Sequence, residues 1–271
     1  MGSWRIRQYA PADGLPPARC RKVLFGLCLK QKREVIATMV LPINKNSQHN
    51  INPVAAYPGR PLAHGLYDPA REHDACGIGF IVDIHNRKKH EIIQNGLRML
   101  CNLEHRGAVG ADPQAGDGVG LLMQLPHEFL VKATAKEGFS LPEPGKYGVG
   151  MFFMPKDQNS AAQIKLVLEK AVSDHGQKVL GWRTVPVDNS VLGYSVKPTE
   201  PDHVQLFIGR SEAIEDEDRF ELLLYVIRRV AWLLIVNSGI EDKETYYSAS
   251  MSCRTLLYKG MLVGNRLAAY Y

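Results

Sequence analysis

The chain has 271 residues, 45% of them hydrophobic, so it can bury a substantial core in one large or two small domains without help from metals or disulfides. Its formal charge is +5, but residues 1–50 hold 9 Lys/Arg against 2 Asp/Glu and the other 221 residues carry −2, which argues against a folded nucleic-acid binder. Five widely spaced cysteines without a Cys-x-x-Cys pair argue against a disulfide framework or zinc site, and the lack of an apolar run near 20 residues argues against a membrane span, so we expect a soluble cytoplasmic protein.

The first part of the chain reads as a leader. Residues 1–66 are rich in Pro, Arg, Lys and Asn and show no sustained period apart from the short piece Val35 to Leu41. We therefore predict a mobile leader over residues 1–75, followed by one domain over residues 76–271. A start at Met39 would leave 37 residues before Cys76, which suggests the hypothesis that residues 1–38 are an upstream extension of the reading frame.

From Gly65 onward, short apolar strands alternate with amphipathic helices. We expect strands over 76–84, 121–125, 148–154, 204–208 and 246–257, helices over 91–103, 161–172 and 220–236, and surface connections over 197–202 and 212–218. These elements do not form a run of βα units, because several strands would pair as hairpins. The pattern predicts an α+β fold in which helices cover layered antiparallel sheets.

Cys76 is the candidate nucleophile. An internal cysteine is more often buried and inert, and a reactive one needs a base, for which His73 is the local candidate. Cleavage of the Ala75–Cys76 bond would change the chemistry, because the new α-amino group has a pKa of about 8 and can accept the thiol proton. Gly77 would leave room for the attacked group, and the predicted strand would pack closely at its second glycine.

Arg106 is the second candidate site residue. It follows the predicted helix over 91–103, where it can either neutralise the helix C-terminus or hold a carboxylate beside a thiolate. The five glycines within 107–120 lack the Gly-Lys-(Ser/Thr) of a phosphate-binding loop, so we interpret them as a tight turn entering the next strand. Asp112 and Asp117 can orient that turn or line a pocket, and we predict the structural role.

Several motifs in order resemble one family. The motifs are Glu72-His73-Asp74-Ala75-Cys76-Gly77-Ile78-Gly79-Phe80, Glu104-His105-Arg106-Gly107, Gly116-Asp117-Gly118-Val119-Gly120, Ser252-Cys253-Arg254-Thr255 and Tyr258-Lys259-Gly260-Met261. Over roughly residues 65–265 the chain resembles the class II glutamine amidotransferase domain of the glutamate synthase large subunit. Other class II amidotransferases usually begin directly at Met-Cys, so the leader with Gly65-Leu66-Tyr67-Asp68-Pro69 favours glutamate synthase.

The resemblance carries expectations about fold and mechanism. It implies the four-layer α-β-β-α sandwich of N-terminal-nucleophile hydrolases, incomplete in this chain, and a propeptide cut before Cys76. Cys76 would attack the side-chain amide of glutamine and release ammonia, which the complete enzyme would use to form glutamate from 2-oxoglutarate. Arg106 would lie beside the nucleophile and order the site.

The resemblance also implies parts that this sequence does not contain. FMN and an iron–sulfur cluster are implied for the full-length enzyme and no cofactor for this chain; the implied partners are the remainder of the large subunit and a small subunit. The family's Arg-(Phe/Tyr)-Ser-Thr and His-Asn-Gly-Glu motifs, which supply the carboxylate-binding arginine and the oxyanion hole, do not occur before Tyr271. We therefore expect the isolated chain to be inactive, and its apolar end to be a cut one. Two alternatives remain: the chain is a non-catalytic subunit that docks on the rest of the synthase, or it is the product of a truncated reading frame with no independent role. The sequence also leaves the electron donor of the complete enzyme open.

Overall fold

The computed structural model describes residues 65, 77–104, 107 and 111–271. Almost all of the predicted leader and both predicted site residues, Cys76 and Arg106, lie outside the described residues. The helices are α1 (His90–Asn102), α2 (His127–Lys136), α3 (Gln158–Asp174), α4 (Glu217–Val236) and α5 (Leu267–Tyr270). The strands are β1 (Val119–Gln124), β2 (Tyr147–Met154), β3 (Lys178–Thr184), β4 (Asp202–Gly209), β5 (Tyr247–Ser252) and β6 (Thr255–Gly260).

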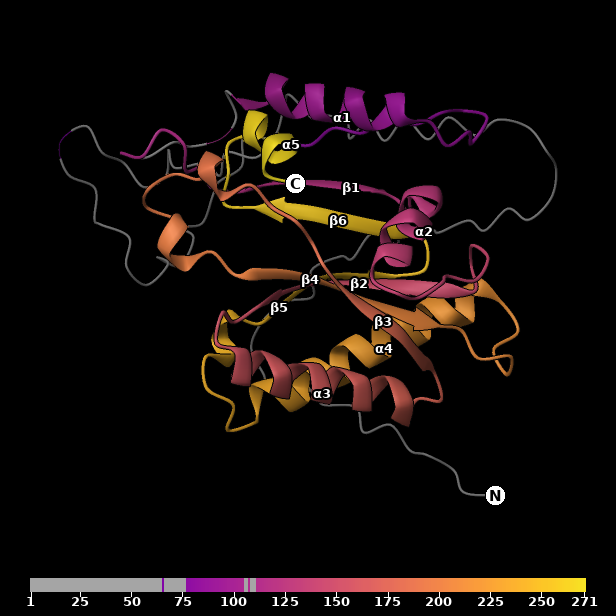
Figure 1. The fold of residues 1–271 in the computed structure, drawn as a ribbon. Coiled ribbons are helices and arrows are strands. Elements are labelled where there is room, and N and C mark those ends of the chain that lie inside the picture. The colour runs from indigo at the N-terminus through magenta and orange to yellow at the C-terminus, as the bar shows by residue number, and fades with distance from the viewer. Residues whose placement is uncertain (1–64, 66–76, 105–106, 108–110) are drawn as a thin grey trace, which may run out of the picture. The chain divides into compact units, whose positions relative to one another are not determined.

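The described strands form two antiparallel sheets. One has four strands in the order β3-β4-β2-β5, and the other is the pair β1-β6, in register from Val119 opposite Gly260 to Gln124 opposite Thr255. Figure 1 shows α3 and α4 on one side of the four-stranded sheet, the β1-β6 pair on its other side, and α1 beyond that pair. The prediction of an α+β fold with layered antiparallel sheets is therefore confirmed.

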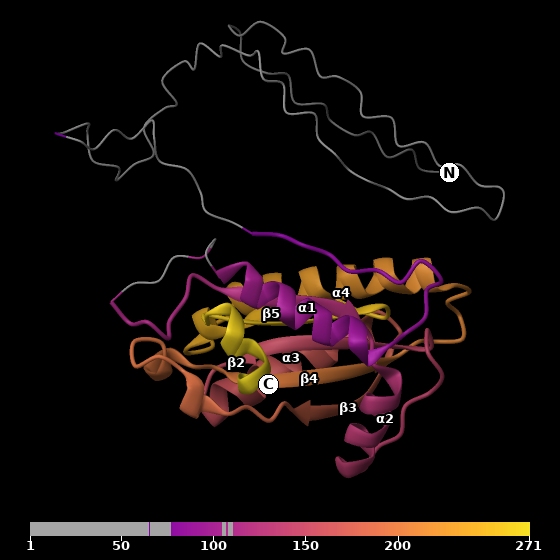
Figure 2. The same cartoon turned by 90° about the horizontal axis from the view of Figure 1, so that it is seen from above.

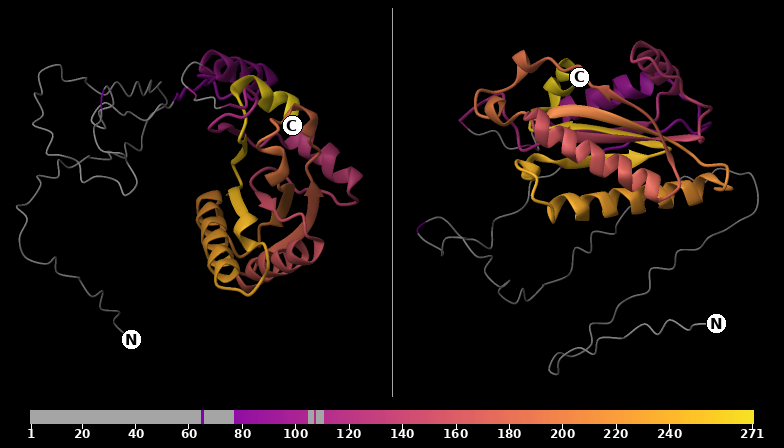
Figure 3. Two further views of the ribbon diagram at one scale, coloured as in Figure 1. Left: turned by 90° about the vertical axis from the view of Figure 1, so that its left-hand side faces the viewer. Right: turned by 60° about the horizontal axis from the view of Figure 1, so that its bottom comes forward.

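The larger core lies between the four-stranded sheet and helices α3 and α4 (Figure 3). Each strand contributes alternate residues to it, as the two-residue period of a strand requires: Phe152 and Met154 come from β2, and Leu206 and Ile208 from β4. Both helices start at an aspartate whose carboxylate accepts a backbone N–H one turn on, Asp157 for α3 and Asp216 for α4, which replaces a missing helical hydrogen bond. The predicted helices over 161–172 and 220–236 are thus confirmed, each with extra residues at its start.

A second core joins the two sheets. The alternate residues of β2, Tyr147, Val149 and Met151, lie in a different cluster from the one that α3 and α4 cover, and they pack with Phe207 of β4, Leu256 of β6 and Leu130 of α2. The register of β2 against β5 shifts between Met151 and Phe152, so β5 carries one extra residue there. Because side chains of β2 fill both cores, this strand is buried along its length, as a continuous apolar run predicts.

Helix α1 contacts strand β1. Figure 2, seen from above, shows α1 in front of the sheets. A Cβ on Gly96, the buried residue of α1, would lie 3.0 Å from a terminal carbon of the Leu121 side chain, which would have to shift slightly to admit it. Leu97 and Leu100 of α1 join a small apolar cluster with Leu262, Leu267 and Tyr270 near the C-terminal end of the chain. The predicted helix over 91–103 is confirmed, with bounds one residue earlier.

Three sequence predictions need correction. Within the predicted strand over 76–84, residues 77–83 form no regular secondary structure and pair with no described strand, and Asp83 turns the chain at residues 84–85 by accepting the His85 N–H at 2.8 Å. The single strand predicted over 246–257 is two strands in different sheets, because the Ser252 hydroxyl accepts the N–H groups of Arg254 and Thr255 in the tight turn that joins β5 to β6. Helix α2 and strand β3 were not predicted.

Candidate functional site

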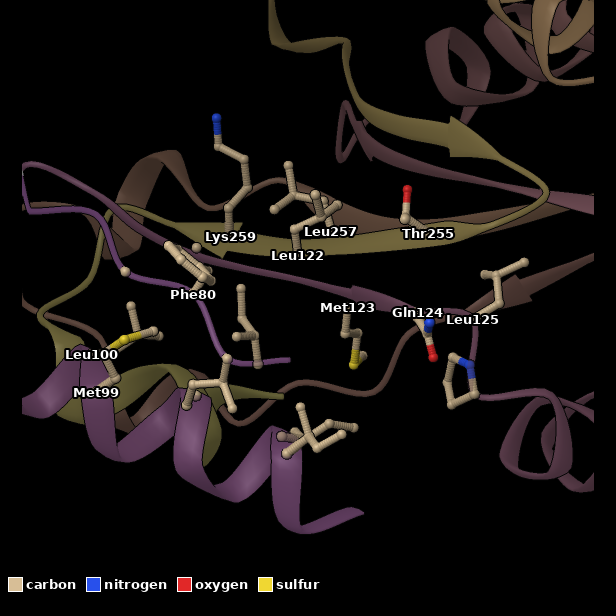
Figure 4. Close-up of a pocket in the computed structure, with 18 of the residues that line it drawn as sticks. Phe80, Met99, Leu100, Leu122, Met123, Gln124, Leu125, Thr255, Leu257 and Lys259 are labelled. Atoms are coloured by element: carbon tan, nitrogen blue, oxygen red, sulfur yellow. The ribbon is translucent and has the colours of Figure 1, made fainter. Parts of the chain in front are cut away.

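A large open cavity of about 1450 Å³ lies beside the segment that follows Cys76. Residues 77–82 form one wall, helix α1 contributes Met99 and Leu100, and the β1-β6 pair contributes its outer face. Figure 4 shows the segment that carries Phe80 running between α1 and β1. Gly77, the first described residue after Cys76, is among the residues that line this cavity.

One face of the β1-β6 pair supplies polar groups to this cavity. Leu122, Thr255, Leu257 and Lys259 stand on the same side of the pair (Figure 4). The Lys259 amine donates to the Tyr247 hydroxyl at 3.3 Å and lies 4.7 Å from the centre of the same ring. An ammonium held over a phenol ring is a cation–π contact, which keeps this positive charge at the cavity wall. A substrate carboxylate is the kind of group that such a charge can attract.

Other parts of the chain approach two glycines of the cavity wall closely. A Cβ on Gly79 would lie 2.2 Å from the Met99 sulfur, so a side chain at this position would require the flexible Met99 side chain to move. A Cβ on Gly120 would lie 3.1 Å from the Lys259 Cβ, in the β1-β6 pair. Gly79, predicted from the sequence to allow close packing, thus lies against α1 at the cavity, whereas Gly120, predicted to belong to a tight turn, lies within strand β1.

Asp112 anchors the glycine-rich turn. Its carboxylate accepts the Ser195 N–H at 2.8 Å and the Ser195 hydroxyl at 2.7 Å, and it also accepts the Gln114 N–H at 3.1 Å. These hydrogen bonds, the Ser195 N–H first, lower the pKa of Asp112. The predicted structural role of Asp112 is confirmed: it ties the turn before β1 to the loop at 193–197. Asp117, the second acid of that turn, lines the cavity.

A side-chain hydrogen bond joins β1 to the end of the segment that runs from Gly77 to helix α1. The Gln124 amide donates to the Asn86 side-chain oxygen at 3.3 Å, and Asn86 has a positive φ of 54° in the turn that leads to α1. At the same end of the cavity, a ring nitrogen of His127 lies 3.0 Å from the Tyr147 hydroxyl, and burial raises the pKa of Tyr147 to about 12. Tyr147 is thus a neutral hydroxyl throughout the physiological range of pH.

The two predicted site residues, Cys76 and Arg106, lie outside the described residues, and only their neighbours can be located. Gly77, next to Cys76, lines the cavity, and Gly107, next to Arg106, donates its N–H to the Glu104 carbonyl at 3.1 Å just after α1. The residues that sequence reasoning did not select are Lys259 and Tyr247. The Tyr258-Lys259-Gly260-Met261 motif was the available signal for the lysine, whereas nothing in the sequence marked the tyrosine.

In the part of the chain that the structure describes, no group of three or more His, Cys, Asp or Glu side chains is arranged to hold a metal ion. None of the described helices is long and apolar enough to cross a membrane.

Comparison with known proteins supplies the family. The model of the class II glutamine amidotransferases matches residues 76–271, so the match begins at Cys76. The chain belongs to the class II glutamine amidotransferases. Within this family it is of the glutamate synthase type. It is 41% identical over 215 residues to the large chain of the NADPH glutamate synthase of Bacillus subtilis, covering 79% of this chain and 14% of that protein.

Other relatives have the same name but different electron donors. The NADH glutamate synthase of Schizosaccharomyces pombe is 34% identical over 216 residues, which cover 78% of this chain and 10% of that protein. The chloroplastic ferredoxin-dependent glutamate synthase of Oryza sativa subsp. japonica is 36% identical over 209 residues, 77% of this chain and 13% of that protein. The chain thus spans roughly a tenth to a seventh of the length of these relatives. Similarity to all three leaves the electron donor open.

Proposed function

We propose that residues 76–271 are the glutaminase part of a glutamate synthase and that Cys76 is its nucleophile. The observation that carries the proposal is the large cavity beside residues 77–82, at the position where the family match begins. The Cys76 sulfur attacks the side-chain carbonyl carbon of glutamine, the carbon–nitrogen bond breaks, and ammonia leaves with the proton that the thiol gave up. Water then hydrolyses the γ-glutamyl thioester, which releases glutamate and restores the thiol.

The base for this reaction is proposed to be the α-amino group of Cys76. It exists only after the Ala75–Cys76 bond is cut, which makes residues 1–75 a leader and propeptide. Its ordinary pKa of about 8 suits proton transfer near neutral pH. Arg106 orders the site beside the nucleophile. This assignment rests on the Glu104-His105-Arg106-Gly107 motif and on the resemblance to the family.

The proposed fold is the four-layer α-β-β-α sandwich of the N-terminal-nucleophile hydrolases. It is supported by the sequence of layers in Figure 1, from α3 and α4 through the two sheets to α1. The longer enzyme would use the ammonia to aminate 2-oxoglutarate, with FMN and an iron–sulfur cluster in parts that this chain does not include. A small subunit would be a further partner.

The isolated chain is proposed to have negligible glutaminase activity. The two motifs that would supply the oxyanion hole and the carboxylate-binding arginine are absent from its sequence. Loss of one oxyanion donor costs about a hundredfold to a thousandfold in rate. The chain would therefore act together with the remainder of a synthase.

A second candidate function is a non-catalytic subunit that docks on such a remainder. The observation that favours it is the segment at 77–84, whose alternate apolar side chains Ile78, Phe80, Val82 and Ile84 are 71–88% exposed. Water contact with so much apolar surface is unfavourable, and a strand partner would cover one side of it.

One experiment separates the two candidates. The 271-residue chain is mixed, with and without the remaining part of the Bacillus subtilis large chain, with a glutamine analogue that carries an electrophilic diazoketone. The first proposal expects a mature N-terminus at Cys76 and label on Cys76 only in the mixture, with Cys76→Ala unlabelled and Cys101→Ala labelled normally. Binding to the remainder without cleavage or label would support the docking subunit. Label on the Cys76→Ala chain would refute the assigned nucleophile.

A further inference from the structure

The turn that leads into β1 has few apolar contacts to hold it in place. Residues 111–118 are all described, and Asp112 is the only buried residue among them. None of these residues belongs to an apolar cluster of the fold. A segment with so little buried apolar surface opens readily unless polar contacts restrain it.

Asp112 supplies polar contacts from inside the protein. Its side chain is 5% exposed. One carboxylate oxygen accepts both the N–H and the hydroxyl of Ser195, at 2.8 and 2.7 Å, and the other accepts the Gln114 N–H at 3.1 Å. The Ala115 N–H donates to the Asp112 carbonyl at 3.1 Å and closes the turn. A buried carboxylate with three donors is a fully satisfied anion, so it can fix the turn at this point.

The loop that receives this carboxylate is itself fixed. A Cβ on Gly193 would lie 2.4 Å from a carboxylate oxygen of Asp112, so a side chain there would displace the carboxylate from its hydrogen bonds. The N–H groups of Val196 and Lys197 both donate to the Gly193 carbonyl, at 3.2 and 3.1 Å. Leu192, just before this loop, packs against the apolar cluster of Leu262, Leu267 and Tyr270. The loop can therefore hold Asp112 in one place.

The restrained turn forms part of the cavity wall. Asp117 and Gly118 line the cavity together with Gly77, whereas Asp112 is not among the lining residues. We propose that Asp112 is a positioning residue for the glutaminase: it holds the turn at 111–118 as a fixed wall of the cavity and so sets the affinity of the cavity for glutamine. This proposal rests on the function proposed above.

A change at Asp112 should loosen the wall without altering the reacting groups. In Asp112→Asn an amide nitrogen replaces one carboxylate oxygen, so the backbone N–H of either Gln114 or Ser195 loses its acceptor. Asp157→Asn is the matched control, since the Asp157 carboxylate accepts the Ser160 N–H at 2.7 Å at the start of α3. Figure 1 shows α3 on the side of the four-stranded sheet that faces away from the β1-β6 pair.

Hydrogen exchange in the complete 271-residue chain tests the restraint itself. We expect the backbone amides of residues 113–120 to exchange about tenfold faster or more in Asp112→Asn, and by a smaller factor in Ser195→Ala, which keeps the backbone donor. In Asp157→Asn only the start of α3 should exchange faster. Ser195→Ala also decides the matter if Asp112→Asn does not fold. Unchanged exchange at 113–120, or an equal increase there in Asp157→Asn, would overturn the proposal.

Labelling of Cys76 tests the effect on glutamine. The chain is mixed with the remaining part of the Bacillus subtilis large chain and with increasing concentrations of the diazoketone analogue of glutamine. Asp112→Asn should raise the half-saturating concentration about tenfold or more and leave the maximal labelling rate within about threefold, because the turn holds neither the nucleophile nor its proposed base. Asp157→Asn should change neither value.

The outcomes separate this proposal from the function on which it rests. A half-saturating concentration unchanged in Asp112→Asn would show that Asp112 only stabilises the fold, and a fall confined to the maximal rate would equally contradict the positioning role. A parent mixture that is never labelled would refute the nucleophile assigned to Cys76. Hydrogen exchange would then still decide whether Asp112 holds the cavity wall.

Discussion

Replacing Gly116 with alanine tests whether the glycine-rich turn exists for packing. A Cβ on Gly116 would lie 2.6 Å from the Leu262 carbonyl oxygen and 2.9 Å from its carbonyl carbon. Both are backbone atoms, so they cannot turn aside as a side chain could. The turn before β1 and the segment after β6 must separate to admit the methyl group, and such overpacking costs about 1–3 kcal/mol.

The expected loss is measurable by thermal unfolding. For a domain of this size, 1 kcal/mol corresponds to about 2–4 °C in Tm, so Gly116→Ala should lower Tm by about 2–12 °C. Gly239→Ala is the matched control, because a Cβ there meets nothing within 4 Å, and its stability should stay within about 0.5 kcal/mol of the parent chain. Equal stability of the two variants would refute the packing explanation and leave a role in substrate binding for Gly116.

Three further predictions concern buried polar groups. Burial lowers the pKa of His203 from 6.5 to about 4 in the folded chain. As the pH falls, the unfolded chain therefore takes up a proton on His203 before the folded chain does. The free energy of unfolding should fall by up to about 1.4 kcal/mol per pH unit between pH 6.5 and pH 4. The free energy of unfolding, measured with urea at several pH values, should depend less steeply on pH in His203→Phe than in the parent chain. An unchanged pH dependence would contradict this prediction. Burial and the Glu221 carboxylate, 3.1 Å from the sulfur, raise the pKa of Cys253 to about 12, so native protein at pH 8 should react with iodoacetamide at the exposed Cys101 and not at Cys253. Comparable alkylation of both in native protein, read by peptide mass, would be the opposing result. Tyr270→Phe removes a hydroxyl that donates to Glu200 at 2.9 Å and should cost about 1.5–3 kcal/mol, whereas Tyr194→Phe, at a 70% exposed position, should cost almost nothing in the same unfolding assay.

Helices with a strong local period of apolar residues were predictable from the sequence, whereas the pairing of strands into sheets was not. Helix α4 shows its period over 20 residues, and the aspartate at its start is a local signal. Strand β3 was missed because Gly181 and Arg183 interrupt its apolar pattern; the structure fills the space at Gly181 with the Phe139 ring, which comes from another part of the chain. The segment at 77–84 has the apolar alternation of a strand, but alternation does not supply the neighbour to which a strand must bond.

The same limit applies to the candidate site. Cys76 and Arg106 were selected by local motifs and by resemblance, and their roles remain predictions. The contact of Lys259 with Tyr247 crosses from β6 to β5, and that of Asp112 with Ser195 joins residues 83 positions apart. Such contacts are decided by which loops the sheets bring together, and no short stretch of sequence encodes them. Only Asp112 could be selected in advance, since an aspartate among glycines is a common turn anchor.

The pairing of β1 with β6 has a consequence for the order in which the chain folds during synthesis. Gln124 is opposite Thr255, so the first strand must wait for 131 further residues before its partner exists. At about 5–20 residues per second the ribosome needs roughly 7–26 s to make them. During that interval α3, α4 and most of the four-stranded sheet can already associate, while Leu121 to Met123 stay without their partner strand. The emerging chain is therefore most exposed to misassociation, and most in need of a chaperone, in the seconds before β6 leaves the ribosome.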